Sequence, residues 1–257
     1  MKPRLIRFGI LVIWVLTMIS LPILRWTLGD QSLRYGIVFG VLIQVLLVLV
    51  ILIQAWGFLN ALFTISIIIL LAWLAEWIGS STGLLFGNYH YTQELHPQLL
   101  DVPLLVPFAW LMMLPPAWAV AAVLLGCPKK LGSWHSKIAF ASLSALAFTA
   151  WDFFLDPQMV AWNFWQWDQP GGYFGIPWHN YLGWLIVSAL ITLIVGRVDL
   201  PIGPLLLVYL VTWILQTIGQ GLFWGQPGPA VIGFLVMGTL LLITFFRLRR
   251  NSCKLSL

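Results

Sequence analysis

The sequence has very little charge. Of its 257 residues, 8% are charged and 61% are hydrophobic, whereas roughly one quarter of an average soluble domain is charged. This balance excludes a water-soluble globule. Glycine and proline are frequent, but they lie among Leu, Val, Ile and Trp rather than in polar repeats, which excludes low-complexity disorder. The composition indicates a protein of the lipid bilayer.

Cysteine is scarce, and the motifs of common cofactor-binding enzymes are missing. The two cysteines, Cys127 and Cys253, fall on the side expected to be cytoplasmic, where thiols stay reduced, so no disulfide is expected. The sequence contains no Gly-x-Gly-x-x-Gly, no Gly-x-x-x-x-Gly-Lys-Ser/Thr and no Gly-x-Ser-x-Gly. No cofactor is therefore expected, and any chemistry must use carboxylates, amides, phenols, indoles and water.

Long stretches without charge predict the membrane helices. A span needs about 20 apolar residues, and 41 uncharged residues separate Arg34 from Glu76 while 47 separate Asp199 from Arg247. Each stretch predicts two spans, with reversals at 56–60 and 225–229. Single spans fit near 8–24, which we expect to be a helix and not a signal peptide, and near 103–125, 137–154 and 181–195. We expect an all-α polytopic membrane bundle of about eight helices, forming a single integral membrane domain over residues 1–257.

Charge is distributed unequally between the two ends of these helices. With both termini assigned to the cytoplasm, 11 of the 13 Lys and Arg residues lie on the cytoplasmic side, in agreement with the positive-inside rule. A basic face here indicates lipid headgroups and not nucleic acid. Seven of the eight acidic residues lie on the opposite side, which is therefore the candidate functional face. The composition fits the plasma membrane and an internal photosynthetic membrane equally.

Three acidic residues near expected helix ends are candidates for catalysis. Glu76 ends the third span, where the alternative is an interfacial carboxylate in water. Asp152 and Asp156 are spaced i, i+4, so both carboxylates lie on one face of the fifth helix, which Pro157 is expected to stop. If the pair is buried, repulsion favours keeping one carboxyl protonated, as a general acid requires. The alternative is a solvated acidic helix end.

Other polar residues have simpler interpretations. Asp101 and Asp199 each stand two residues before a proline and are expected to cap the helices that follow. His90, Glu94 and His179 could form a single-metal site, but four histidines in the chain are too few for a histidine-rich di-iron centre. We therefore expect loop histidines and no metal.

Aromatic residues are concentrated in one segment. Twelve of the 34 residues from Trp151 to Trp184 are aromatic, against 15% in the whole chain. Most belong to a glycine- and proline-rich connection at about 156–180, expected on the non-cytoplasmic side, that could fold back into the bilayer. Aromatic rings pack against isoprenoid chains and stabilise carbocations. The alternative is interfacial anchoring.

Several motifs between Glu76 and Trp184 resemble the membrane carotenoid hydratases, a family that includes carotenoid 1',2'-hydratases and bisanhydrobacterioruberin hydratase. The resemblance is carried by Phe86-Gly87-Asn88-Tyr89-His90-Tyr91-Thr92, Asp101-Val102-Pro103, Asp156-Pro157, Trp165-Gln166-Trp167 and Gly172-Tyr173-Phe174-Gly175-Ile176-Pro177-Trp178-His179-Asn180-Tyr181-Leu182-Gly183-Trp184. It implies cofactor-free addition of water to the terminal double bond of an acyclic carotenoid, such as a lycopene- or gamma-carotene-like end group, giving a tertiary alcohol. Downstream carotenoid-modifying enzymes are possible partners.

The candidate residues can be assigned roles in such a reaction as a hypothesis. Asp152 or Asp156 donates a proton to the alkene, and Glu76 or the other aspartate orients water and takes back a proton. Asn180 fixes the water. The expected substrate-binding set contains Tyr91, Trp165, Trp167, Tyr173, Trp178, His179, Asn180 and Trp184.

Two other functions fit parts of the sequence. Asp152 and Asp156 resemble half of the aspartate-rich pair of Mg²⁺-dependent membrane prenyltransferases, but the second acidic motif is missing. A carotenoid- or isoprenoid-binding or transport protein would share the polytopic build, although no second copy of the Trp151–Trp184 segment is present.

Overall fold

The protein is a bundle of apolar helices. The computed structural model describes residues 3–250 and 253, and in this part of the chain eight helices are long and apolar enough to cross a membrane. The protein is therefore an integral membrane protein, as predicted. The helices are α1 (Pro3–Leu28), α2 (Asp30–Trp56), α3 (Phe58–Thr82), α4 (Leu105–Leu124), α5 (Trp134–Ala161), α6 (Trp178–Val195), α7 (Ile202–Ile218), which the π-helix η1 (Gly219–Phe223) prolongs, and α8 (Pro227–Arg250).

Glycine and proline separate consecutive spans where the sequence predicts reversals. Gly57 is the single residue between α2 and α3, and its φ of 78° is a left-handed value that other residues rarely adopt. Gly29 joins α1 to α2 in the same way, with φ of 81°. The break between η1 and α8 falls at 224–226. The reversal predicted at 56–60 is confirmed, whereas the one predicted at 225–229 ends earlier, because Pro227 already begins α8.

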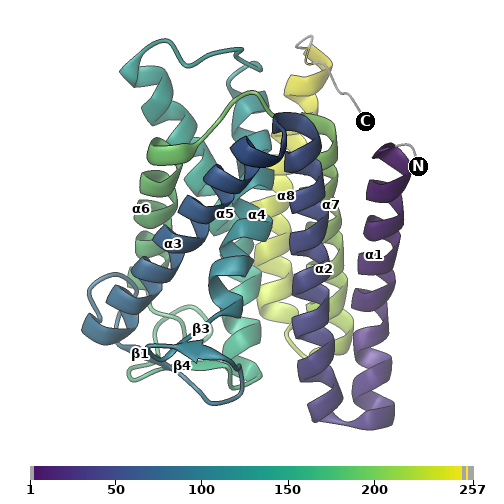
Figure 1. The fold of residues 1–257 in the computed structure, drawn as a ribbon. Coiled ribbons are helices and arrows are strands. Elements are labelled where there is room, and N and C mark those ends of the chain that lie inside the picture. Colours follow the sequence, from purple (N-terminus) through teal and green to yellow (C-terminus); the bar gives the residue numbers. More distant parts are fainter. Residues whose placement is uncertain (1–2, 251–252, 254–257) are drawn as a thin grey trace.

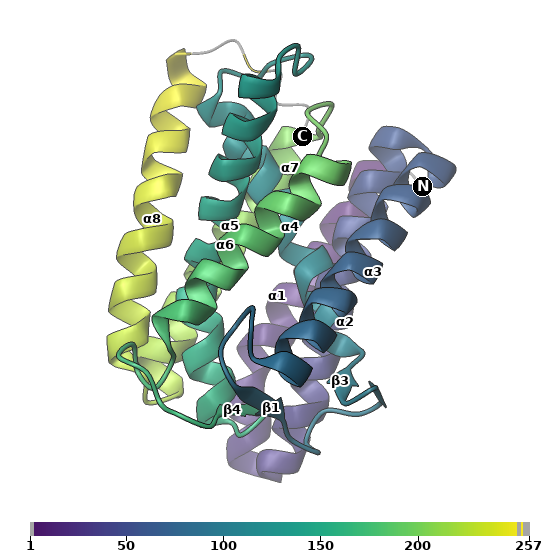
Figure 2. The ribbon, with the colours of Figure 1, turned by 90° about the vertical axis from the view of Figure 1, so that its left-hand side faces the viewer.

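Helix α4 lies at the centre of the bundle and positions the site. It contacts α2, α3, α5, α7 and α8, and nearly all of its side chains are buried. Helix α1 packs mainly on α2 at the edge of the bundle (Figures 1 and 2). Many large apolar side chains on the outer helices are exposed, such as Phe8, Phe39 and Phe63, which suits contact with lipid tails.

Two short antiparallel strand pairs cover one end of the bundle (Figure 1). Strand β1 (Tyr89–Tyr91) pairs with β4 (Trp165–Trp167), with Tyr89 opposite Trp167 and Tyr91 opposite Trp165. Strand β2 (Gln98–Leu99) pairs with β3 (Val102–Pro103). The aromatic connection predicted at 156–180 is thus not a free loop, because its middle forms β4 and is held by a strand 76 residues earlier in the chain.

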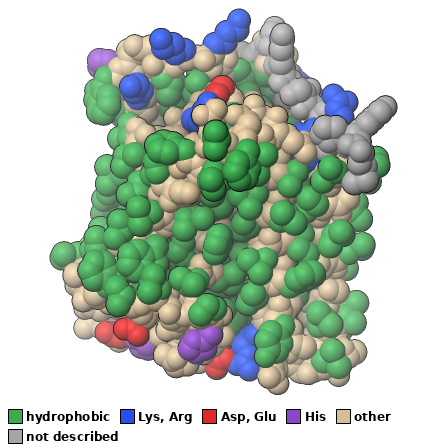
Figure 3. All heavy atoms as spheres, in the orientation of Figure 1, with side chains coloured by type: hydrophobic (Ala, Val, Ile, Leu, Met, Phe, Trp, Pro, Cys, Tyr) green, Lys and Arg blue, Asp and Glu red, His purple; other side chains and the backbone are tan. Residues whose placement is uncertain are grey.

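The two ends of the bundle differ in charge. In Figure 3 the Lys and Arg side chains gather mostly at the end where α1 begins and α8 ends, while acidic and histidine side chains gather at the end with the strands. This matches the charge asymmetry of the sequence. That the basic end faces the cytoplasm stays a prediction.

Helix α5 corrects the expectation that Pro157 stops it. The helix continues to Ala161 with Pro157 inside it. A proline in a helix leaves the carbonyl four residues earlier without its usual donor. Here that carbonyl belongs to Phe153, and it accepts a hydrogen bond of 2.9 Å from the Tyr173 hydroxyl. A distant side chain thus compensates for the missing amide hydrogen.

Three further expectations are wrong. Asp101 does not cap α4, which begins at Leu105 after the strand β3, and the Asp101 side chain is exposed. Asp199 does not cap α7 either, since its carboxylate pairs with Arg197 at 2.6 Å. Cys127 and Cys253 form a disulfide, because the turn after α4 and the segment after α8 bring their Cα atoms within 5.8 Å.

Candidate functional site

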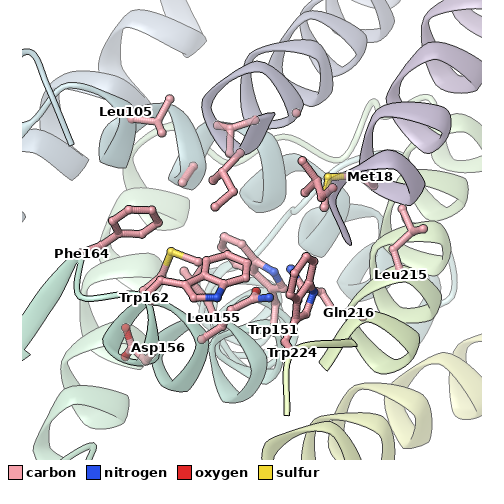
Figure 4. Close-up of a pocket in the computed structure, with 18 of the residues that line it drawn as sticks. Met18, Leu105, Trp151, Leu155, Asp156, Trp162, Phe164, Leu215, Gln216 and Trp224 are labelled. Carbon is pink, nitrogen blue, oxygen red and sulfur yellow. The ribbon is translucent and has the colours of Figure 1, made fainter. Parts of the chain in front are cut away.

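An apolar cavity of about 720 Å³ lies inside the bundle. Residues from α1 to α7, β1 and β4 line it, and most of them are aliphatic or aromatic (Figure 4). Glu76, Asp156 and Asn180 are among the few polar lining residues, and none of the described lining residues is Lys or Arg. The volume falls within the range of small-molecule binding sites.

Glu76 is buried in the wall of this cavity and not at a wet interface. Its side chain is 4% exposed. One carboxylate oxygen accepts a hydrogen bond of 2.9 Å from Trp110 Nε1 on α4. The other accepts from the hydroxyls of Tyr89 and Tyr91, at 2.6 and 2.7 Å. Three neutral donors therefore fix the carboxylate and satisfy it in an apolar environment.

Asp152 and Asp156 form a buried pair on α5, with exposures of 0% and 2%. The Asn180 side chain, in the first turn of α6, donates to an oxygen of both, at 3.1 Å for Asp152 and over a shorter contact for Asp156. The Asn180 amide therefore bridges the two carboxyls. Two acids bridged by one amide can share a proton, which the solvated alternative would not allow.

The paired strands β1 and β4 carry side chains that donate hydrogen bonds to Glu76 and to Asp156. Side chains alternate along a strand, so Tyr89, Tyr91, Trp165 and Trp167 share the inner face while His90 lies on the exposed face. Trp165 Nε1 donates to Asp156 at 3.1 Å, whereas the two tyrosines donate to Glu76. Cross-strand ring contacts at 5.7 and 5.8 Å stiffen this face.

None of the three buried acids forms an ion pair in the described part of the chain. Their partners are neutral phenols, indoles and an amide. Burial, and after it the negative charge of Glu76, raise the pKa of the Tyr89 and Tyr91 phenols well above the usual value. These tyrosines therefore remain hydrogen-bond donors at any physiological pH.

A stack of aromatic rings lies next to Glu76. The rings of Trp110 and Trp184 are stacked with centroids 4.8 Å apart, and Phe148 stacks on Trp184 at 5.1 Å. Trp110 also donates to Glu76, so the same residue holds a carboxylate and joins the stack. The stack supplies a rigid π surface in the wall of the cavity.

The structure brings most of the predicted residues together. Glu76, Tyr91, Asp156, Trp165, Trp167, Asn180 and Trp184 line the cavity, and Asp152 lies directly behind Asp156 and Asn180. Trp178 and His179 have exposed side chains and lie outside the cavity. Tyr173 is buried, but it packs on Phe153 and Tyr181 away from the cavity. These last three positions do not line the cavity, and a role for them in substrate binding stays a prediction.

The possible metal ligands are not brought together. The His90 imidazole lies 3.2 Å from Asp168, and Glu94 pairs with Arg34. Within the described residues, no group of three or more His, Cys, Asp or Glu side chains is placed to hold a metal ion.

Sequence reasoning missed three residues of the site. Tyr89 could have been found, because residues i and i+2 of a strand share a face and Tyr91 was a candidate. Trp110 carries no such signal. It is an aromatic residue in an apolar helix, and its partner Glu76 lies 34 residues earlier in the chain. Trp151 was noted only as part of an aromatic-rich segment, and it lines the cavity.

Fold and site together define a polytopic membrane protein with an apolar cavity that carries buried, hydrogen-bonded acids. The chain matches the family described as carotenoid biosynthesis proteins over residues 35–240, and it belongs to that family. Glu76, Asp152 and Asp156 all fall within the matched residues.

One curated relative is similar over part of the chain. Bisanhydrobacterioruberin hydratase from Haloarcula japonica is 32% identical over 164 residues, which cover 60% of this chain and 54% of the relative. The chain therefore spans about half the length of this relative. No solved structure matches the chain.

Proposed function

We propose that the protein is a carotenoid hydratase that adds water to the terminal double bond of an acyclic carotenoid end group. The observation that carries this proposal is the meeting of Glu76 and the Asp152–Asp156 pair at one apolar cavity without a neutralising cation. Membership of the family and the printed name of the relative support the same reaction class.

Asp156 is the proton donor in this proposal. It lines the cavity, whereas Asp152 is absent from the lining and is joined to it by the bridging Asn180 amide. Protonation of the less substituted alkene carbon consumes the π bond and leaves a tertiary carbocation at the methyl-bearing carbon. The rings of Trp165, Trp167 and Tyr91 face the same space and stabilise this charge by cation–π attraction.

Glu76 completes the reaction as a base. A water molecule held between its carboxylate and the cation adds to the tertiary carbon, and the proton released passes to Glu76. One water is consumed and a tertiary alcohol forms, after which solvent exchange returns the proton to the aspartate pair. Three fixed donors keep Glu76 oriented, so little reorganisation accompanies the step.

The experiment is expression in a bacterium that accumulates lycopene, followed by chromatography and mass spectrometry of the pigments. We expect a pigment heavier by one water with an unchanged chromophore. Asp156→Asn and Glu76→Gln should abolish this product, while Asn60→Leu, at an exposed helix start, should retain it. An unchanged pigment with a well-expressed protein contradicts the proposal, and full activity of both acid variants removes them from the mechanism.

Binding or transport without chemistry is the alternative outcome of the same experiment. It predicts that lycopene co-purifies with the protein and keeps its mass. Prenyl transfer is disfavoured by the charge of the cavity, because a diphosphate needs cations, and the described lining residues include acids but no Lys or Arg.

A further inference from the structure

The cavity that holds the acids has an opening on the outside of the bundle. Among its described lining residues only six are exposed, with exposures of 40% to 66%, and the others are buried or half-buried. These six residues border both the cavity and the surroundings of the protein, so they form the rim of an opening. They are Ile19, Ile23 and Trp26 on α1, and Ile214, Ile218 and Phe223 on α7 and η1.

The rim is made by two helix faces at the edge of the bundle. The three residues on α1 are spaced i, i+4, i+7, and Ile214 and Ile218 are spaced i, i+4, so each set lies on one face of its helix. Helix α1 packs mainly on α2 and only weakly on α7. The rings of Trp26 and Phe223 meet edge to face with centroids 5.9 Å apart, which joins the two sides of the rim.

The opening faces lipid tails and not water. All six rim residues are apolar, and all belong to two of the spans that are long and apolar enough to cross a membrane, Arg4–Leu28 and Ile202–Phe223. An exposed apolar surface in such a position is in contact with hydrocarbon. A ligand dissolved in the bilayer therefore reaches the cavity sideways, without passing through water.

A row of aromatic rings leads from the rim toward the acids. Phe223 on the rim is followed in the chain by Trp224, whose ring contacts that of Trp162 with centroids 5.2 Å apart. Trp162 in turn contacts Phe164 at 6.1 Å, and the next residue, Trp165, donates to one of the buried acids. All five residues line the cavity, and Figure 4 shows three of them beside it. Flat rings pack well along a conjugated chain.

We propose that this opening binds the hydrocarbon chain of an acyclic isoprenoid ligand, which enters sideways from the bilayer while its end group reaches the acids. The chain lies along the row of rings, and the part beyond the rim remains among lipid tails. The rim carries no charged side chain, so it favours an apolar chain over a polar headgroup. The inference rests on the proposed function, because it assigns the ligand's entry and the position of its chain in the same cavity.

The test measures how much carotenoid stays bound, whether or not it is hydrated. The full chain is purified in detergent from the bacterium that accumulates lycopene. Bound carotenoid per protein is measured by absorbance, which hydration leaves unchanged, relative to micelles carried through the same purification without the protein. Ile19→Trp and Ile218→Trp each place a large side chain at the rim, and each should reduce the bound carotenoid about fivefold or more.

Ile243→Trp is the matched control. Ile243 on α8 is as exposed as Ile218, but it does not line the cavity. The same substitution there should leave the bound carotenoid unchanged. A general effect of an added tryptophan on the membrane surface would instead lower binding in all three variants.

A second measurement uses the unmodified protein, so it does not depend on how the variants fold. The full chain in lipid nanodiscs is photolabelled with a geranylgeranyl ether whose diazirine lies at the end opposite the terminal alkene. Labelled peptides are identified by mass spectrometry with and without excess lycopene. We expect the adducts that lycopene displaces to lie on α1 between residues 15 and 26, or on α7 and η1 between residues 211 and 223.

Absence of bound carotenoid from the unmodified protein overturns the inference, as does unchanged binding in both rim variants or displaceable labelling only on other helices. Rim adducts that lycopene does not displace also overturn it, because bilayer lipid alone would then fill the opening. A protein that retains lycopene of unchanged mass, and loses it in the rim variants, supports this inference and contradicts the proposed function. The two failures are therefore distinguishable.

Discussion

Replacement of Asn180 by leucine is the sharpest test of the acidic pair. Leucine has a similar volume but no hydrogen-bonding group, so Asn180→Leu removes both bonds that the amide donates to Asp152 and Asp156. Both carboxyls are buried, and Asp152 already has one oxygen without a partner. The variant therefore leaves two acids facing each other without their bridge.

The magnitude follows from the two bonds. A net hydrogen bond contributes about 1 kcal/mol between neutral groups and about 1.5 to 3 kcal/mol when one group is charged. With one carboxyl protonated and one ionised, the free energy of unfolding should fall by about 2.5 to 4 kcal/mol. The assay is denaturant unfolding in detergent micelles, followed by tryptophan fluorescence, with hydration of lycopene measured in parallel.

Asn60→Leu is the matched control. Asn60 donates to the Trp56 carbonyl at 3.1 Å, but its side chain is exposed, so we expect a change below about 0.5 kcal/mol. If Asn180→Leu destabilises the protein no more than this control and still hydrates lycopene, the amide does not hold the acids and the reasoning about the pair fails.

The remaining predictions concern the groups around the acids. Because burial and the charge of Glu76 raise the pKa of Tyr91 in the folded state, stability should be unchanged up to about pH 10 and fall above it, as unfolded tyrosine ionises. Tyr91→Phe should make this fall less steep in alkaline unfolding curves, because one of the tyrosines that cause it is removed, and an equally steep fall would contradict the assignment. Tyr173→Phe should cost about 1 kcal/mol of unfolding free energy, but less in a Pro157→Ala background, where the helix regains its own donor; equal costs in a double-mutant cycle would show that the hydroxyl does not serve the proline. Trp165→Phe keeps the ring but loses the 3.1 Å bond to the cavity-facing aspartate, so hydration measured by pigment analysis should fall at least tenfold while the protein still folds, and undiminished hydration would exclude that bond from the reaction.

Local features of the sequence predict the membrane architecture well. Spans follow from hydropathy, and reversals follow from glycine and proline, as Gly57 illustrates. The same reasoning fails at Pro157, where a residue later in the chain supplies the hydrogen-bond donor that the proline lacks. Pro157 stays inside α5 because Tyr173 supplies a donor from the following connection. Asp199 fails as a cap for a local reason, because its carboxylate pairs with Arg197 two residues earlier.

The candidate acids could be named from the sequence, but their surroundings could not. The spacing of Asp152 and Asp156 places them on one helix face, which is a property of the helix alone. Whether that face is wet or buried depends on α6, which supplies Asn180. Trp178 and His179 were expected to bind substrate, yet their side chains are exposed and do not line the cavity.

The sequence by itself determined that this is a polytopic membrane protein of a carotenoid biosynthesis family, because hydropathy and motifs are read from neighbouring residues. Only the tertiary structure decided that Glu76 meets Tyr89, Tyr91 and Trp110, and that Asn180 bridges Asp152 and Asp156. These side chains come from separate helices and strands. A buried acid needs donors at hydrogen-bonding distance, and only the packing of those elements places them there.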